Sequence, residues 1–334
     1  MPRFLVTLFL GSFLLSGSAF CAEPSSYSLG LFSYGIRFPD GTGQDTAALP
    51  SLPANMAWVA HAGGKYTSPV DAMAHLADWC VLGGNVVPVD ARCTLLIAPG
   101  IYELGADQLI MRAGVDIVGM GVRTTVLSGA VDSAALGEES ALIRGADHTT
   151  LRDLTVVNAG AQHASSGIYN VELSFIIKHA EVVVSGNASL STGIENKGFG
   201  SKFSDITVSA TGLTDCVGIR NTGNGSIIIN RASISASGCA KNTAITNLNA
   251  VGLRLADVNA SATATGAQRA VGLWSSGSGL TVLDSKLEGA TYSLGIGSTS
   301  ARIINTQLDG PVGANSAGTQ CWGTYDSNLA DRGC

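Results

Sequence analysis

The side chains best suited to acid–base chemistry recur at one fixed interval. Asp153, His179, Asp205, Arg231 and Asp257 follow one another at a spacing of 26 residues, and Asp284 and Asn305 continue the series less regularly. A histidine between two carboxylates could act as a general base, so His179, Asp153 and Asp205 are the fallback catalytic residues. Alternating charges in one column could equally neutralise each other as ordinary surface ion pairs, and we favour that structural role.

Hydroxyl and amide side chains form a second set at the same interval. Its members occupy alternate positions of three successive repeats: Thr207, Ser209, Thr211, Ser233, Ser235, Ser237, Asn259, Ser261 and Thr263. Alternation along a strand turns these side chains outward together. They predict a flat, uncharged face that could bind a glycan or serve in adhesion. Outward Ser and Thr are also ordinary on strands, so a merely soluble β-surface is the alternative.

Elements that place like residues in columns must themselves repeat. Two apolar series share the 26-residue interval: Leu151, Ile177, Phe203, Ile229 and Leu255, and Val156, Val182, Val208, Ile234 and Ala260. A period of this length indicates a solenoid in which each turn buries its apolar side chains against its neighbours. The predicted fold class is all-β, a right-handed parallel β-helix.

Asparagines repeat at a position of their own, two residues beyond the start of a predicted strand. They are Asn170, Asn196, Asn221 and Asn247. An inward amide can donate a hydrogen bond to the identical amide of one neighbouring turn and accept one from the other. We predict a structural asparagine ladder rather than a catalytic role.

The chain begins with a segment that we exclude from the fold. Residues 1–22 combine one early arginine, an apolar run from Phe4 to Leu15 and small residues that end at Ala22, as a secretory signal peptide does. A membrane anchor and a lipidated Cys21 are the alternatives, although the apolar run is short for a span.

Four regions follow from the sequence. After the signal peptide come an extended arm over 23–56, a parallel β-helix over 57–310 and a C-terminal cap over 311–334. Near 68–79, Ser68 and Pro69 are typical of a helix start, and Val70, Met73, Ala74 and Ala77 form an apolar stripe. We predict that this short helix closes one open end of the solenoid.

Cysteine usage agrees with export. Without Cys21, the neighbouring cysteines form three pairs, Cys80 with Cys93, Cys216 with Cys239, and Cys321 with Cys334. No two cysteines have the two-residue separation that is common among zinc ligands, and the histidines are scattered along the sequence. We therefore predict no metal site.

The net charge of the chain limits the classes of partner that it can bind. The full chain has 19 basic and 25 acidic residues and a net charge of −6, with only 13% charged residues. An acidic chain of this kind excludes nucleic acid as a partner and disfavours an anionic membrane. No transmembrane segment and no cofactor are predicted for the mature chain.

The first half contains a recognisable order of motifs. A strand over 57–60 is followed by Gly63-Gly64-Lys65-Tyr66-Thr67, the predicted helix, Ile97-Ala98-Pro99-Gly100-Ile101-Tyr102, and glycine-bounded strands through 115–127. This order resembles the entry to pectin-lyase-like right-handed parallel β-helices, pectin methylesterases included, and to uncharacterised secreted bacterial proteins with β-helix repeats. The resemblance covers about residues 57–310 and implies the fold. The paired acids, calcium cage or Asn-x-Asp and Gly-His-Gly segments of the enzymes of this fold are not found in the sequence.

These observations favour a secreted or cell-surface protein, with the periplasm as a further location, that presents its polar face to a polysaccharide or another surface component without catalysis. The alternatives are a diverged polysaccharide lyase or esterase, and a subunit of a surface appendage, suggested by a strand-and-turn motif over 35–46 that resembles tail-fibre proteins. The oligomeric state stays open.

Overall fold

A computed structural model describes residues 30–32, 35–37, 43–44, 55–81, 92–264, 268–297, 300–314, 318–328 and 330–331. The chain divides into two units, residues 1–50 and 51–334. The predicted signal peptide lies outside the described residues, and the predicted arm is described only in part. In the first unit three short antiparallel strands pair in the order β1 (Gly30–Phe32), β2 (Gly35–Arg37) and β3 (Gly43–Gln44).

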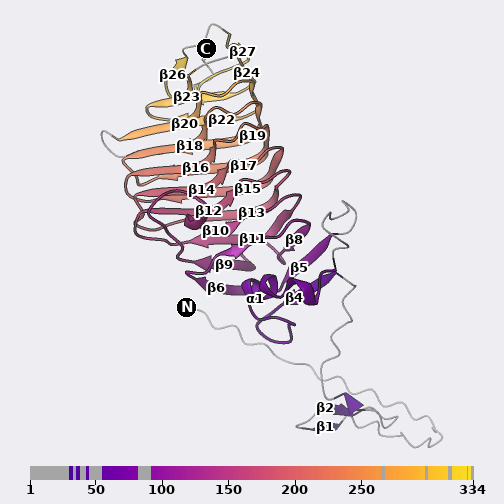
Figure 1. Ribbon diagram of the computed structural model, residues 1–334. Coiled ribbons are helices and arrows are strands. Elements are labelled where there is room, and N and C mark those ends of the chain that lie inside the picture. The colour runs from indigo at the N-terminus through magenta and orange to yellow at the C-terminus, as the bar shows by residue number, and fades with distance from the viewer. Residues whose placement is uncertain are drawn as a thin grey trace, which may run out of the picture. The chain divides into compact units, whose positions relative to one another are not determined.

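The second unit is a parallel β-helix, as predicted, and its coils are right-handed (Figure 1). One stack is a nine-stranded sheet made of β7 (Leu109–Ile110), β10 (Ala141–Arg144), β12 (Ala164–Asn170), β14 (Leu190–Asn196), β16 (Asp215–Asn221), β18 (Lys241–Asn247), β20 (Arg269–Ser275), β23 (Tyr292–Ile296) and β26 (Val312–Ala314). All strand pairs of this sheet are parallel.

The other stack is a 15-stranded sheet. It contains β4 (Met56–Val59), β5 (Cys93–Ile97), β6 (Gly100–Gly105), β8 (Val115–Val118), β9 (Thr125–Gly129), β11 (Thr150–Asn158), β13 (Ile176–Val184), β15 (Ser201–Thr211), β17 (Ile227–Ser237), β19 (Leu253–Ala262), β21 (Leu280–Leu283), β22 (Lys286–Gly289), β24 (Ala301–Ile304), β25 (Gln307–Asp309) and β27 (Gln320–Trp322). The coils from β5 to β26 therefore contribute to both stacks, and the space between the stacks is the core.

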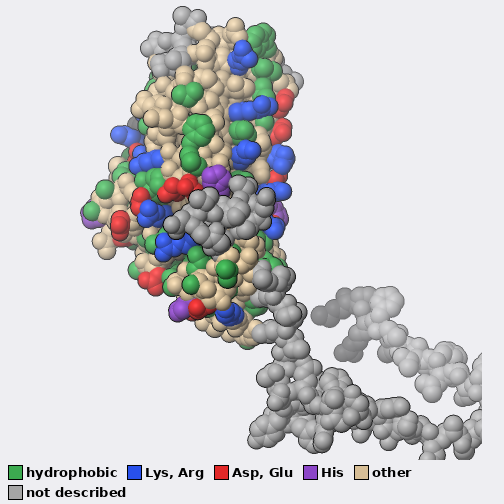
Figure 2. Space-filling view, turned by 45° about the vertical axis from the view of Figure 1, so that its right-hand side comes forward, with side chains coloured by type: hydrophobic (Ala, Val, Ile, Leu, Met, Phe, Trp, Pro, Cys, Tyr) green, Lys and Arg blue, Asp and Glu red, His purple; other side chains and the backbone are tan. Residues whose placement is uncertain are grey.

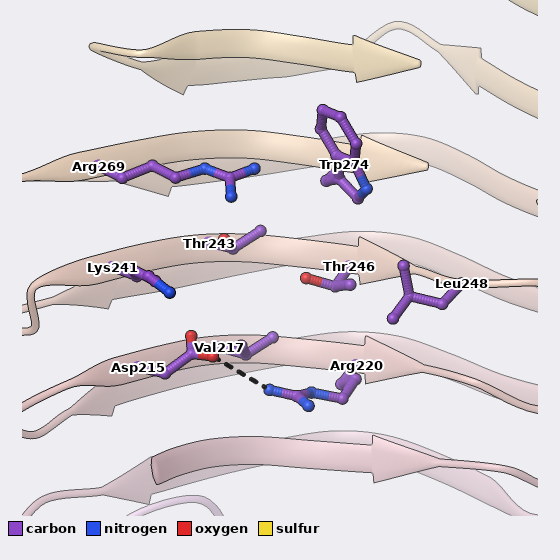
Figure 3. A pocket seen from close by; sticks show the side chains of 9 residues that line it. All are labelled: Asp215, Val217, Arg220, Lys241, Thr243, Thr246, Leu248, Arg269 and Trp274. Carbon is purple, nitrogen blue, oxygen red and sulfur yellow. Dashed lines mark ion pairs between the residues drawn. The ribbon is translucent and has the colours of Figure 1, made fainter. Parts of the chain in front are cut away.

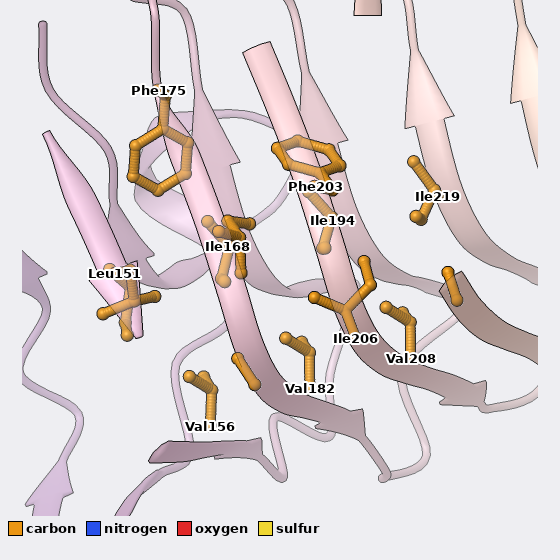
Figure 4. Close-up of a cluster of buried hydrophobic side chains, with 14 of the residues drawn as sticks. Leu151, Val156, Ile168, Phe175, Val182, Ile194, Phe203, Ile206, Val208 and Ile219 are labelled. Atoms are coloured by element: carbon orange, nitrogen blue, oxygen red, sulfur yellow. The ribbon is translucent and has the colours of Figure 1, made fainter. Parts of the chain in front are cut away.

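Both predicted apolar columns fill that core. The register places Leu151 beside Ile177, and Ile177 beside Phe203, in successive strands. Every member of the two columns is at most 1% exposed. Figure 4 shows some of them, Leu151, Phe203, Val156, Val182 and Val208, in one cluster with Ile168 and Ile194 of the nine-stranded sheet. Burial of this kind stabilises each coil only through its neighbours, as in other solenoids.

The 15-stranded sheet bends at one position of every coil. Seven residues there have left-handed backbone: Asp153, His179, Asp205, Arg231, Asp257, Asp284 and Asn305, with φ between 45° and 58°. In β11 and β13 the residues on either side are paired, whereas Asp153 and His179 are left out of the ladder. Asp, Asn and His tolerate this conformation better than most side chains do. The residue types of the column thus reflect a backbone requirement.

The four asparagines of the predicted ladder are hydrogen-bonded in series. Asn170 Nδ2 donates to Asn196 Oδ1 at 2.9 Å, and the next two bonds, to Asn221 and Asn247, measure 2.8 Å each. Asn247 then donates to Ser275 Oγ at 3.0 Å. All four amides are at most 1% exposed, so this series satisfies polar groups that water does not reach.

The N-terminal end carries the predicted helix, α1 (Pro69–Ala74), followed by a 3-10 turn, η1 (Leu76–Asp78). Ser68 accepts a hydrogen bond from the Val70 amide, and proline occupies the first turn. The predicted apolar stripe is partly wrong. Ala74 is exposed because the helix buries the face with Pro69, Ala72 and Met73, and Ala77 is exposed because it lies beyond the end of the α-helix. Another 3-10 turn, η2 (Glu138–Ser140), precedes β10.

Two predicted disulfides are confirmed. Cys80 is bonded to Cys93, and Cys216 to Cys239, with Cα atoms 5.7 and 5.6 Å apart. Cys321 belongs to a disulfide, but its predicted partner Cys334 lies outside the described residues. In the described part of the chain, no helix has the length and apolar character that a membrane span needs.

Replacing one ladder amide tests its contribution. Asn196 accepts from Asn170 and Ser201 and donates to Asn221 and the Gly198 carbonyl. We expect Asn196→Ala to lower the free energy of unfolding by about 2–4 kcal/mol, since several buried groups lose their partner. Urea denaturation measures the loss.

Asn259 provides the matched control, because it is an exposed asparagine of the 15-stranded sheet. We expect Asn259→Ala to change the free energy of unfolding by less than about 0.5 kcal/mol. If both substitutions change the free energy of unfolding equally, the hydrogen bonds of the ladder do not stabilise the fold.

Candidate functional site

A groove lies on the outer face of the nine-stranded sheet, across β16, β18 and β20 (Figure 3). Its volume is about 370 Å³. Side chains of the three strands that point away from the core line it, and the register aligns them between strands. The lining consists of Asp215, Val217, Arg220, Lys241, Thr243, Thr246, Leu248, Arg269 and Trp274.

One wall of the groove is a charged column. Asp215, Lys241 and Arg269 are the first residues of their strands and pair in register. Arg220 Nη2 lies 3.8 Å from Asp215 Oδ2. Within the described residues neither Lys241 nor Arg269 has an ion-pair partner. This wall therefore offers two positive charges that are available to a ligand.

The opposite wall carries Arg220, Thr246 and Trp274, again one column. The Trp274 ring lies against the next coil at Gly295, where an added Cβ would come within 2.3 Å of the ring. The Arg269 guanidinium lies 5.4 Å from the ring centroid, a cation–π distance. The indole is thus fixed between a cation and a glycine, with part of its surface exposed.

A buried carboxyl lies at the lower end of this wall. Glu195 of β14 is 1% exposed, and its Oε2 lies 3.5 Å from Arg220 Nε. Neither of these two atoms has a hydrogen-bond partner, whereas Glu195 Oε1 accepts from Thr222 Oγ1 at 3.0 Å. Burial raises the pKa of Glu195, and the nearby Arg220 and Thr222 oppose that rise. Arg220 is held between Glu195 and Asp215.

The predicted catalytic column does not converge on this groove, since it lies at the bend of the 15-stranded sheet. Its members form separate pairs: His179 Nδ1 is 2.7 Å from Asp153 Oδ1, and Arg231 Nε is 2.6 Å from Asp205 Oδ1. Hydrogen bonding from Arg231 lowers the pKa of Asp205. The side chains of His179 and Arg231 are more than half exposed, which matches surface ion pairs of small energetic value.

The polar array occupies the outer face of the 15-stranded sheet in the expected register. Thr207, Ser233 and Asn259 pair strand to strand and are exposed. The same column continues into Glu181 on one side and Lys286 on the other. The face is therefore neutral over three coils and charged at both ends.

A second depression of about 430 Å³ lies beyond the array, over β19, β22 and β25. It brings together Asp257 and Asp284 of the bend column, Asn259 of the array, and Lys286. Asn305 donates to Asp284, and Lys286 lies 3.2 Å from Asp309 and 3.3 Å from Glu288. The cation of this depression, Lys286, is thus already paired with two carboxylates.

Sequence reasoning missed Glu195, Arg220 and Lys241 as a group. A signal was present, because Glu195 and Arg220 each directly precede a ladder asparagine and must point away from the core. The described residues contain no cluster of three His, Cys, Asp or Glu side chains that could hold a metal ion.

Comparison with known proteins places the fold. No family model and no curated sequence matches the chain. A pectin methylesterase structure from Aspergillus niger aligns with 83% of this chain and 87% of its own, at 14% identity and a TM-score of 0.50. The chain has the pectin-lyase-like fold.

Two further solved structures align with lower TM-scores. Pectin methylesterase PemA from Erwinia chrysanthemi is 14% identical, covering 83% of this chain and 90% of its own, with a TM-score of 0.48. The A-module of mannuronan C-5 epimerase AlgE6 from Azotobacter vinelandii is 15% identical, covering 78% and 73%, with a TM-score of 0.45. At these identities the likeness concerns the fold alone.

The raised pKa of Glu195 gives a pH signature. A carboxyl whose folded pKa exceeds its unfolded value of 4.5 stabilises the fold below that value, and the contribution is lost as pH rises through the folded pKa. We expect the stability of the wild-type protein relative to Glu195→Gln to fall as pH increases from 4.5 upward, by about 1.4 kcal/mol per unit of pKa shift. Urea denaturation over a pH series measures this difference.

Glu181 is the control with the opposite sign. Hydrogen bonds from Arg123 lower the pKa of Glu181. The contribution of this carboxylate to folding stability is therefore present above pH 4.5 and lost as the pH falls through the folded pKa. The free energy of unfolding of the wild type should therefore exceed that of Glu181→Gln by less as the pH falls below 4.5. A pH-independent difference for Glu195→Gln would show that its carboxyl is not perturbed by burial.

Proposed function

We propose that the protein is an exported glycan-binding β-helix and that an acidic glycan binds in the groove over β16, β18 and β20. The observation that carries the proposal is the pair of unmatched cations, Lys241 and Arg269, on a wall that faces Trp274. The confirmed disulfides support export to an oxidising compartment.

The chemistry of the lining suits an acidic sugar. Ammonium and guanidinium groups form charge-assisted hydrogen bonds with carboxylates. The exposed part of the Trp274 indole combines apolar carbon with a polar N–H, which matches the mixed surface of a pyranose ring. Thr243 adds a hydroxyl between the two walls, and Thr246 adds another on the wall of Trp274. The carbohydrate named for the Aspergillus niger structure, pectin, is of this acidic class.

An esterase or lyase is the second candidate, because two carboxyls and a guanidinium adjoin in the groove. A carboxylate can attack an ester while a second group acts as the acid. Asp215 is accessible, with a side chain one-third exposed, but Glu195 is 1% exposed and cannot reach a substrate without rearrangement. Binding without turnover therefore agrees better with the geometry.

The polar array remains a proposed second contact. Its hydroxyls and Asn259 could bind a neutral stretch of glycan through many weak hydrogen bonds and interfacial water.

Charge removal in the groove tests the proposal. We expect the double variant Lys241→Gln, Arg269→Gln to bind polygalacturonate at least about tenfold more weakly than the wild type, since each charged hydrogen bond contributes roughly 1.5–3 kcal/mol. Isothermal titration calorimetry at low salt gives the affinities, with dextran as the uncharged comparison.

The array provides the matched control. Replacing Thr207, Ser233 and Asn259 together by lysine should leave folding and polygalacturonate affinity unchanged or slightly increase the affinity. If the array variant loses binding and the groove variant does not, the ligand site lies on the 15-stranded sheet.

Assays for turnover separate binding from catalysis. We expect no methanol release from pectin and no unsaturated products from polygalacturonate or alginate, because Glu195 is inaccessible. Turnover that disappears in Asp215→Asn and persists in the double variant His179→Ala, Asp205→Ala would establish the groove as an active site. The reverse result would establish the bend column.

A further inference from the structure

A row of cations runs along the outer face of the 15-stranded sheet, away from the groove. Lys202 of β15, Arg254 of β19 and Arg302 of β24 occupy a single register column. All three are exposed, and no described residue forms an ion pair with any of them. We call these three residues the cation row.

The cations of the row are evenly spaced. Ile228 and Thr281, both half-buried, fill the coils between them, so a charge appears on every second coil. Parallel strands stack about 4.8 Å apart, which puts the charges about 10 Å apart along the solenoid axis. Lys178 of β13 is exposed one coil below Lys202 and two residues further along its strand, and extends the row.

The neighbouring acids do not form ion pairs with the three residues of the cation row, although Asp205 acts on Lys178, which in turn helps to lower the pKa of Asp205. They lie at the bend of the sheet, where Asp153 contacts His179 and Asp205 contacts Arg231. Asp257 also acts on Arg231, whose pKa it helps to raise. Figure 2 shows Lys and Arg side chains spaced along the right-hand part of the molecule, beside a file of mixed acidic and basic side chains.

We propose that the cation row binds a linear acidic polysaccharide that lies along the solenoid axis and carries an anionic group at intervals of about 10 Å, such as a chain in which acidic and neutral sugars alternate. Each anionic group meets one cation, and the half-buried Ile228 and Thr281 face the neutral sugars between them. The surface is independent of the groove, because it belongs to the other sheet.

The shape of the row favours this partner over other polyanions. A single column bordered by acids contacts a narrow chain, whereas an anionic membrane would also meet the carboxylates of the bend. Double-stranded nucleic acid carries a charge every ~1.7 Å of its axis and needs a broader basic face.

Hyaluronan oligosaccharides, with a carboxylate on alternate sugars, are the probe. Calorimetry on the full protein at low and moderate salt compares the wild type with the triple variant Lys202→Gln, Arg254→Gln, Arg302→Gln. We expect the triple variant to bind at least about tenfold more weakly, and we expect its affinity to depend less on salt than that of the wild type, since salt screens contacts between exposed charges. These exposed substitutions should leave thermal unfolding unchanged.

Two controls distinguish the cation row from the groove, and hyaluronan from other polyanions. The groove variant Lys241→Gln, Arg269→Gln should retain hyaluronan binding; loss of binding there but not in the triple variant would assign the ligand to the groove and overturn the proposal. Absence of hyaluronan binding by the wild type, or tighter binding of single-stranded DNA than of hyaluronan, would also overturn it. Neither of these two results bears on polygalacturonate binding in the groove.

Discussion

The stacking of parallel strands about 4.8 Å apart is the constraint on which the rest of this structure depends. Each residue lies directly above the residue that precedes it by one coil, so a side chain must suit its own position and its two neighbours in the column. Apolar side chains satisfy this inside, as Leu151, Ile177 and Phe203 do. An amide satisfies it at the ladder position, because it can donate to one neighbour and accept from the other.

Positions under this constraint could be predicted from the sequence. The core columns and the asparagine ladder are buried, so few residue types fit and the 26-residue interval is visible. The local pairing of Cys80 with Cys93 and of Cys216 with Cys239 could be inferred for a similar reason, since coil geometry brings such neighbours together. The short helix could be placed by Ser68 and Pro69, whereas its buried face could not, since that depends on where the helix stops.

The chemistry of the surface was harder to predict because outward positions are not restricted in the same way. Glu195, Arg220 and Trp274 share one column but no common chemistry, so residue type does not mark the column, and only its place beside the asparagine ladder could have indicated it. The column that did repeat, beginning with Asp153, repeats for its left-handed backbone rather than for its charges. Arg231 is the exception in that column, and its contact with Asp205 explains how a guanidinium is accommodated there.

The asparagine ladder also has a consequence for how such a protein changes in length. Every junction between Asn170 and Asn247 uses the same amide-to-amide bond, so a whole coil could be duplicated or lost in evolution without leaving a ladder amide unpaired. The groove has no such freedom, because Lys241 contributes to its wall only while β16 and β20 are its immediate neighbours. Gain or loss of one coil would therefore preserve the interior and replace the binding surface in a single step, which lets ligand preference diverge while the scaffold stays the same.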